Sequence, residues 1–375
     1  MAGRAADVTV AGAGIFGACA AYFLRRAGLS VRLLDAWGVA HPRATSAGEA
    51  RVLRCAYGSQ ALYTRWAWDA RRDWLRWERE WNVRLFHCTG VLWLADEENE
   101  YLTASLGHLQ RIGIPVERWT MEEVLRRFPQ FAPLKTRIAV YEPEGGLLLA
   151  RQACRAVVDA FVREGGTFEI AAVPSPENGG HPPEGLWVFA CGPWLPQLFP
   201  RLLGAKIRVT RQEEFFFGTP AGCADFEPER FPVWIDVGAG HDLRDLSYYG
   251  LPTLDGRGAK VALDASGPPF DPTSGDRHTT PEGLTGVRQY MAARLPALKD
   301  APLVESRVCQ YERTADANLI LAQHPEWENV WIAGGGSGHG FKLGPVVGRY
   351  ITARLLGTAD AEPALGAGWP APSAG

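Results

Sequence analysis

The sequence predicts an α/β protein with two lobes, one built around a parallel βαβ unit and one around a mixed sheet. Three observations predict this class. The chain has 375 residues, more than one ordinary domain core contains. Its first 35 residues have the pattern strand, glycine-rich turn, helix and strand. From residue 206 to 308 the pattern changes to strands with charged or aromatic alternation, separated by loops rich in Pro and Gly.

Composition and charge exclude several classes of protein. Hydrophobic residues make up 46% of the chain and charged residues 22%, which is typical of a globular protein and excludes disorder. The 39 basic and 42 acidic residues give a net charge of −3, so we expect no nucleic acid and no anionic membrane as a partner. Seven cysteines without a C-x-x-C pair and eight scattered histidines predict no disulfide framework and no metal site.

Residues 8–24 carry no charge and superficially resemble a secretory signal. They are shorter than the roughly 20 residues that a membrane span requires. They also contain three glycines at fixed spacing, and no apolar stop-transfer segment follows them. We therefore predict a buried strand that enters a buried helix, in a cytoplasmic protein.

The glycines at Gly12, Gly14 and Gly17 form a G-x-G-x-x-G motif between a strand at 8–11 and a helix at 18–27. A second strand at 31–34 ends at Asp35. This context is the dinucleotide-binding fingerprint, in which glycines let the backbone approach a pyrophosphate and the carboxylate accepts hydrogen bonds from ribose hydroxyls. The fingerprint does not distinguish NAD from FAD, and a glycine turn that only packs a helix on a strand is the alternative.

Other elements follow from periodicity and from capping signals. A tryptophan stripe over residues 60–80 predicts a helix with one buried face. Thr120 and Glu123 have the spacing of a capping box that opens a short helix. The remaining expected helices are 97–113, 150–164, 281–294 and 345–356, and the remaining expected strands are 89–95, 167–173, 186–190, 319–322 and 330–333.

A second glycine cluster lies at residues 334–342, again between an apolar strand and a helix. A helix N-terminus brought to the same nucleotide would stabilise negative charge on an electron-accepting ring. Gly336 and Gly338 are the glycines of interest, and Lys342 is a candidate partner for a substrate carboxylate. The alternative is a surface loop with a solvated lysine.

Five blocks of this sequence occur in the order found in one family of flavoproteins. They are the first glycine motif with Asp35, residues 48–57, Tyr248-Tyr249-Gly250, residues 308–311 and residues 337–342. The chain resembles the D-amino-acid-oxidase superfamily, and within it the branch of monomeric sarcosine oxidase and N-methyltryptophan oxidase. The resemblance extends from residue 8 to about residue 356.

The resemblance implies a glutathione-reductase-like FAD fold of the D-amino-acid-oxidase type. The FAD-binding domain is then discontinuous, with residues 1–82, 146–206 and 306–358. The substrate domain has residues 83–145 and 207–305, and residues 359–375 form a loose tail. Such enzymes oxidise the C–N bond of a secondary amino acid to an imine, and O₂ reoxidises the flavin to give H₂O₂. We expect a monomer or a small homo-oligomer.

Several cofactor contacts are implied by the same resemblance. Cys309 is where the family attaches its flavin covalently, and Thr45 and Ser46 lie where the cofactor-contacting loop runs. Val173 is also placed at the cofactor, together with Gly336, Gly338 and Lys342 of the second glycine cluster. For Cys309 the alternative is a buried cysteine on a strand.

The substrate site is implied in the same way. Arg51 lies against the flavin, and Arg54 joins Lys342 in binding the substrate carboxylate, a pairing of guanidinium fork and point charge that suits this anion. The spacing of three would place both arginines on one face of a helical turn, while a pair of surface arginines is the alternative. The remaining implied positions are Tyr249 and Tyr311, which line the pocket with Gly338, and Lys260, which assists O₂ reduction unless it is an exposed strand lysine.

Two departures from the family pattern bear on the substrate. Asp264 stands where sarcosine oxidase has a pocket histidine, and Trp234 stands where it has a methionine over the pocket. A carboxylate there favours a cationic amine or acts as a proton acceptor. We therefore expect an FAD-dependent oxidase of an N-methyl or cyclic amino acid. The competing hypotheses are a dehydrogenase or tailoring oxidase of a larger amine or cyclic imine, and a nucleotide-binding protein without catalysis.

Overall fold

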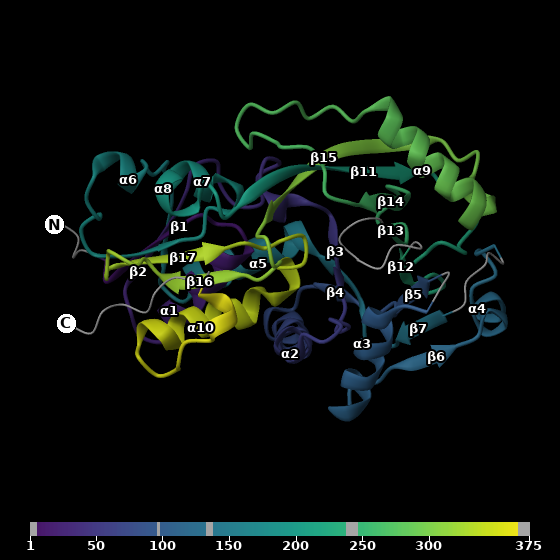
Figure 1. Cartoon of the computed structure of the whole chain (residues 1–375), viewed down its shortest axis with the longest axis horizontal. Helices are drawn as coiled ribbons and strands as arrows, with labels where there is room; N and C mark the ends of the chain where they lie inside the picture. The colour runs from purple at the N-terminus through teal and green to yellow at the C-terminus, as the bar shows by residue number, and fades with distance from the viewer. Residues whose placement is uncertain (1–5, 96–97, 133–137, 238–246, 367–375) are drawn as a thin grey trace.

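A computed structural model of the chain describes residues 6–95, 98–132, 138–237 and 247–366 (Figure 1). It contains two large sheets and one small sheet. The first sheet has six strands in the order β16-β17-β10-β1-β2-β9, and its pairs are parallel except for that of β16 with β17. In that order the strands are Ile320–Gln323, Val330–Gly334, Leu186–Phe189, Val8–Ala11, Val31–Asp35 and Thr167–Ile170.

Three helices pack together beside this sheet. Helix α1 (Ile15–Arg26) contacts α5 (Ala150–Arg163) and α10 (Gly344–Leu355). The contact between α1 and α10 is close because Gly348 of α10 has no side chain: a Cβ there would lie 2.6 Å from the backbone of Cys19. Close approach of this kind is a common reason for glycine inside a helix.

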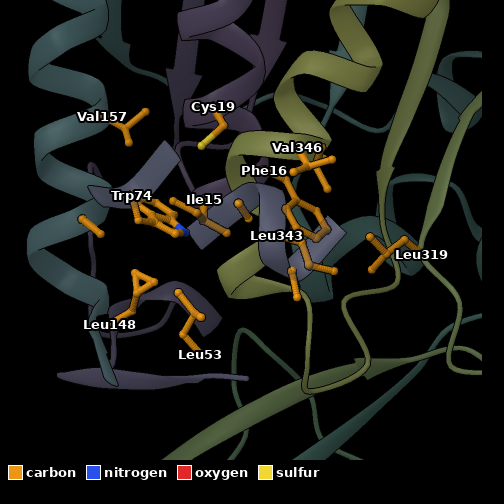
Figure 2. Close-up of a cluster of buried hydrophobic side chains, with 14 of the residues drawn as sticks. Ile15, Phe16, Cys19, Leu53, Trp74, Leu148, Val157, Leu319, Leu343 and Val346 are labelled. Carbon is orange, nitrogen blue, oxygen red and sulfur yellow. The ribbon is translucent and has the colours of Figure 1, made fainter. Parts of the chain in front are cut away.

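Helix α2 (Ala61–Trp81) contacts α10 and lies beside it in Figure 1. Figure 2 shows Trp74 of α2 beside Ile15 of α1 and near Leu53 and Leu148 of two small strands. Trp74 and Trp77 are fully buried, while Trp66 and Trp81 pack against the same core with part of their surface exposed. The predicted tryptophan stripe is thus confirmed as a buried helix face.

The second large sheet is mixed and has eight strands in the order β15-β11-β14-β13-β12-β5-β7-β6. In that order they are Leu303–Arg313, Arg208–Phe217, Ala259–Asp264, Ser247–Leu251, Val233–Val237, Val91–Ala95, Ile138–Glu142 and Glu117–Trp119. Helix α9 (Pro281–Arg294) crosses beside β11 and β14 in Figure 1. Together the parallel and mixed sheets confirm the predicted α/β class.

A small antiparallel sheet, β3-β8-β4, lies between the two large ones in Figure 1. Its strands are Ala50–Leu53, Gly146–Leu149 and Phe86–His87. The remaining α-helices of the described chain are α3 (Glu100–Arg111), α4 (Met121–Arg127), α6 (Pro176–Gly179), α7 (Leu195–Leu198) and α8 (Pro200–Leu203). No helix in these described ranges is both long enough and apolar enough to cross a membrane.

The structure tests two local predictions, the capping box at Thr120 and the loose tail. Thr120 Oγ1 accepts a hydrogen bond from the Glu123 backbone N–H, and Glu123 accepts one from the Thr120 backbone N–H, which confirms the predicted capping box. The predicted loose tail differs from the structure in its first part. Leu365 is fully buried in the main core and anchors this part of the segment, although residues 360, 361, 363 and 364 are exposed; residues 367–375 lie outside the described chain.

Candidate active site

Two neighbouring cavities, of about 280 and 370 Å³, lie between the parallel sheet and the mixed sheet. They share a wall made of Arg51, Tyr311, Ser337, Gly338 and Phe341. Of the residues predicted to bind a cofactor, the first cavity is lined by Gly12, Gly14, Asp35, Thr45, Ser46, Arg51, Val173, Gly336 and Gly338. Of those predicted for catalysis or substrate, the second is lined by Arg51, Arg54, Tyr249, Lys260, Asp264, Tyr311, Gly338 and Lys342.

The first glycine motif shapes the first cavity because its glycines have no side chains, which lets neighbouring backbone segments approach closely. Gly12 has φ +101°, and a Cβ there would lie 2.4 Å from the carbonyl oxygen of Ala190. A Cβ on Gly17 would lie 1.8 Å from the carbonyl oxygen of Gly12. Gly17 therefore lets α1 pack on the turn and does not itself line the cavity.

Asp35 ends β2 at the edge of the first cavity. Its carboxylate accepts backbone hydrogen bonds from Ala13 (2.8 Å), Trp37 (2.9 Å) and Gly38 (3.0 Å). An ionised carboxylate offers about four lone-pair positions. At least one acceptor position is thus left over for a ribose hydroxyl.

The loop before β3 borders the same cavity near the start of α1. Ser46 Oγ accepts a hydrogen bond from the backbone N–H of Ile15 at 3.1 Å. Thr45 Oγ1 is buried and has no hydrogen-bond partner among the described residues. Buried hydroxyls usually have a partner, so an orphaned Thr45 hydroxyl fits a cavity that takes a polar ligand.

Aromatic residues that the sequence analysis did not single out cluster at the end of the cavity near Asp35. The rings of Trp37 and Trp194 have their centroids 4.8 Å apart, and His41 stacks on Trp37 at 5.6 Å. All three line the first cavity. They follow the ends of β2 and β10, strands far apart in sequence, so no local pattern reveals them.

The second glycine loop closes the cavity on the side of β15. Gly338 has φ +80°, and a Cβ there would lie 2.8 Å from the ring of Tyr311. The Glu312 carboxylate accepts a hydrogen bond from the Gly336 backbone N–H at 3.2 Å, which fixes the loop. Burial raises the pKa of Glu312 to about 7.

Arg51 joins the two cavities. Its Nη2 donates to the carbonyl oxygen of Thr45 at 2.8 Å and lies 3.5 Å from Cys309 Sγ. Cys309 is buried on β15 beside this guanidinium and is not itself part of either cavity lining. The expected helical turn through Arg51 and Arg54 is wrong: Arg51 lies on β3, and Arg54 directly follows that strand.

Arg54 is held rigidly in the second cavity. Its guanidinium lies between the rings of Tyr57 and Trp93, with centroid distances of 4.4 and 5.1 Å, and also bonds the carbonyl oxygen of Ala56 and the hydroxyl of Tyr101. The buried Glu142, which the sequence analysis missed, fixes this segment by accepting from the backbone of Cys55 and Ala56 and from Trp93. A rotationally fixed guanidinium is a suitable anchor for a carboxylate.

Lys342 approaches the same cavity from the second glycine loop. Its Nζ donates to the carbonyl oxygen of His339 at 3.1 Å and lies 5.1 Å from the centre of the Tyr57 ring. Burial and the neighbouring Arg54 hold the pKa of Lys342 well below its usual range. Lys342 lines the second cavity and not the first, so its position suits substrate binding better than the predicted cofactor contact.

The mixed sheet supplies the opposite wall. Tyr249, Lys260 and Asp264 project from β13 and β14 into the second cavity. Arg313, on β15, lies 3.4 Å from Asp264. The Asp264 side chain keeps 40% of its surface exposed, but partial desolvation by the surrounding protein raises its pKa, and Arg313 partly offsets this.

Trp234 is not in the pocket, contrary to expectation. It is fully buried on the opposite face of the mixed sheet among Phe131 and Phe231, and its Nε1 donates to Tyr290 at 3.1 Å. Neighbouring residues of a strand point to opposite faces, so Ile235 lines the second cavity in its place.

The chain matches the DAO family, described as FAD dependent oxidoreductase, over residues 7–354. It belongs to this family. The flavoprotein is 28% identical over 371 residues to monomeric sarcosine oxidase from Streptomyces avermitilis, with 95% of each chain covered. It is 30% identical over 364 residues to human peroxisomal sarcosine oxidase, with 92% of this chain and 90% of that one covered.

N-methyl-L-tryptophan oxidases are also among the relatives, which confirms the resemblance predicted from the five sequence blocks. Among solved structures, the L-proline dehydrogenase of P. horikoshii superposes with a TM-score of 0.80 at 20% identity, covering 96% of both chains. This likeness shows the fold. FAD dependence follows from the family, and the first cavity fits FAD through its glycines, the spare acceptor capacity of Asp35 and the unpartnered Thr45 hydroxyl.

Proposed function

We propose that this flavoprotein oxidises the C–N bond of a secondary amino acid, N-methylated or cyclic, to an imine. The observation that carries the proposal is the polarity of the second cavity. The Arg54 guanidinium and the Lys342 amine are the basic groups at one end, while Tyr249, Tyr311 and Asp264 surround the other part of the lining. The relatives named sarcosine oxidase and N-methyl-L-tryptophan oxidase support it, because both names specify N-methyl amino acids.

The residues of this chain would orient the substrate. Arg54 binds both oxygens of its carboxylate, and the bound carboxylate stabilises the protonated form of Lys342, whose pKa is otherwise lowered by burial and by Arg54. Asp264 stabilises a cationic amine or takes its proton. Bound FAD supplies the two-electron acceptor for the hydride of the C–H bond.

The proposed oxidation removes two electrons and two protons from the substrate. The substrate loses a hydride from carbon and a proton from nitrogen, and water then hydrolyses the imine to a carbonyl compound and an amine. In the oxidase form of the proposal, O₂ takes the two electrons and two protons and becomes H₂O₂. Lys260 lies on the wall of the second cavity, where a fixed positive charge favours electron transfer to O₂.

The cofactor is proposed to be linked covalently through Cys309. The support is the burial of Cys309 beside Arg51, next to the wall that the two cavities share. Acid precipitation of the purified protein tests this: the yellow colour should stay in the pellet for the wild type and move to the supernatant for Cys309→Ser. Cys154→Ser is the matched control, since Cys154 is also buried and should retain the pellet colour. Colour in the supernatant of the wild type would contradict the linkage.

A panel of amines tests the reaction. Anaerobic bleaching of the flavin by N-methyl and cyclic amino acids, but not by the corresponding methyl esters, is the expected result. Release of H₂O₂ on admission of air would support the oxidase form. Bleaching that persists in air would instead favour a dehydrogenase, and no bleaching with any secondary amino acid would contradict the proposal.

A further inference from the structure

A buried carboxylate outside the five sequence blocks lies beside Lys260. Glu214 is on β11, next to β14 in the mixed sheet, and stands opposite Ala262. Lys260 is two residues from Ala262 and therefore shares its face of the sheet, diagonal to Glu214. Lys260 Nζ donates to Glu214 Oε1 at 2.7 Å, and both side chains are about 95% buried, with exposures of 4% and 5%.

Cations meet this carboxylate from two other strands. Arg307 of β15 stands directly opposite Glu214, with its Nε 3.6 Å from Oε2. Arg51 of β3 approaches Oε1 to 3.6 Å. Glu214 is thus the meeting point of three positive side chains, and together these groups hold the pKa of Glu214 well below its usual range despite burial.

The charge of Lys260 depends on Glu214, whereas Glu214 also has two arginines beside it. In the described part of the chain, Glu214 is the hydrogen-bond acceptor of the Lys260 ammonium. The other groups that face it are the ring of Tyr249 on β13, with its centroid at 5.2 Å, Arg51 on β3, and Cys309 on β15. Burial and Arg51 lower the pKa of Lys260, whereas Glu214 opposes both.

We propose that Glu214 is the positioning residue that keeps the Lys260 side chain in its ammonium form at the wall of the second cavity. Without this carboxylate, burial and the neighbouring Arg51 would both favour the neutral amine of Lys260 over its ammonium form. What the retained charge does for O₂ reduction rests on the proposed function. The charge itself is tested without FAD, substrate or O₂.

The sequence makes a direct measurement practical because it contains only five lysines, at positions 135, 206, 260, 299 and 342. A ¹³Cε-lysine NMR titration of the full chain resolves them, and Lys260→Met assigns the signal. In Glu214→Gln the titration midpoint of Lys260 should fall by about one to two pH units relative to the wild type. An unchanged midpoint would overturn the proposal.

Two variants guard against a trivial result. Glu213→Gln is the matched control: it is the adjacent residue on the same strand, its carboxylate bonds Arg211 and Thr280, and it should leave the Lys260 midpoint unchanged. If Glu214→Gln does not fold, Arg307→Met is measured instead. Loss of this cation should move the Lys260 midpoint upward, and no movement would overturn the proposal.

Stopped-flow reoxidation then connects the charge to the reaction. The rate with O₂ should be independent of pH in the wild type across the range where the lysine stays charged. In Glu214→Gln it should fall as pH rises through the new lysine midpoint, and in Glu214→Gln/Lys260→Met that dependence should vanish. A shifted midpoint without any reoxidation would remove the oxidase form of the proposed function and leave the role of Glu214 in holding the charge supported.

Discussion

The two cavities are neighbours, yet they are built in different ways. Twelve of the 31 residues that line the first are glycines or alanines, many of them in loops that follow β1, β2 and β17, and these small residues let the backbone approach a ligand closely. The second is lined by charged and aromatic side chains from β3, β13, β14 and β15. The comparison teaches that a cofactor site made of backbone tolerates almost no added atoms, whereas a side-chain site changes gradually with each residue.

The largest effect is expected at the first glycine motif. In Gly12→Ala the new Cβ would overlap the carbonyl oxygen of Ala190 at 2.4 Å in a backbone conformation that favours glycine, so the loop must move. We expect purified protein with less than about a tenth of the wild-type FAD content, measured as flavin absorbance per chain.

Gly28→Ala is the matched control for this variant. Gly28 has a similar φ of +95°, but a Cβ there would meet nothing within 4 Å. Its FAD content should equal that of the wild type, with only the stability cost of the strained backbone, about 1 kcal/mol. Equal FAD content in both glycine variants would show that the first cavity does not depend on close backbone approach.

An intermediate effect is expected in the second cavity at the carboxylate anchor. Arg54→Met removes the guanidinium between Tyr57 and Trp93, and we expect substrate or carboxylate-inhibitor affinity to fall about 10- to 100-fold while FAD content is kept. Titration of the flavin spectrum with the ligand measures this. Arg72→Met, at an exposed site on α2, should not change the affinity. Loss of FAD in Arg54→Met would contradict the assignment of Arg54 to substrate binding alone.

A smaller effect is expected at Asp264, whose side chain is 40% exposed and therefore partly screened. Because its pKa is raised, the carboxylate forms at a higher pH than in a free aspartate. Binding of a cationic amine should therefore tighten as pH rises through this pKa, and in Asp264→Asn the affinity should fall by about fivefold and lose that pH dependence. The same pH profile in both proteins would exclude an ionised Asp264 at the amine.

The smallest effect on activity is expected at Trp234, which lies outside both cavities. Trp234→Phe removes one hydrogen bond to Tyr290 and some packing, so the unfolding free energy should fall by about 1 to 2 kcal/mol with KM changed less than twofold. Ile235→Ala, one residue along the strand, should raise KM more than Trp234→Phe does, since Ile235 lines the cavity. The reverse ranking would mean that the sheet faces are assigned incorrectly.

The fold was predictable from the sequence wherever the signals were local. Helix α2 followed from tryptophan periodicity and α4 from its capping box, and the βαβ unit followed from the spacing of its glycines. Predictions were wrong where the structure of a segment depends on contacts with residues far away in the sequence. Nothing near Leu365 shows that a distant core will cover it, so a segment rich in Ala, Pro and Gly had the pattern of a loose tail.

The site was predictable to the same extent. Family motifs placed Arg54 and Lys342 in one cavity, although the helical geometry assumed for Arg54 was wrong. Glu213 and Glu214 stand side by side in a run that lacks clear alternation, so only the sheet shows that Glu214 faces the cavity. The prediction that Trp234 lies in the pocket was wrong for the same reason. Which face of the sheet a side chain lies on depends on the register of its strand.

The order of strands in the parallel sheet has a consequence for how the protein is made. Strand β1 pairs with β10, which in turn pairs with β17, and the first cavity takes its lining from Gly12 to Phe341. A chain emerging from the ribosome therefore has no complete cofactor site until Phe341 has been synthesised, even though the glycine motif at residues 12–17 emerges much earlier. FAD supply should accordingly govern the last step of maturation, and during translation the apolar core around α1 must persist without α10, which packs against it.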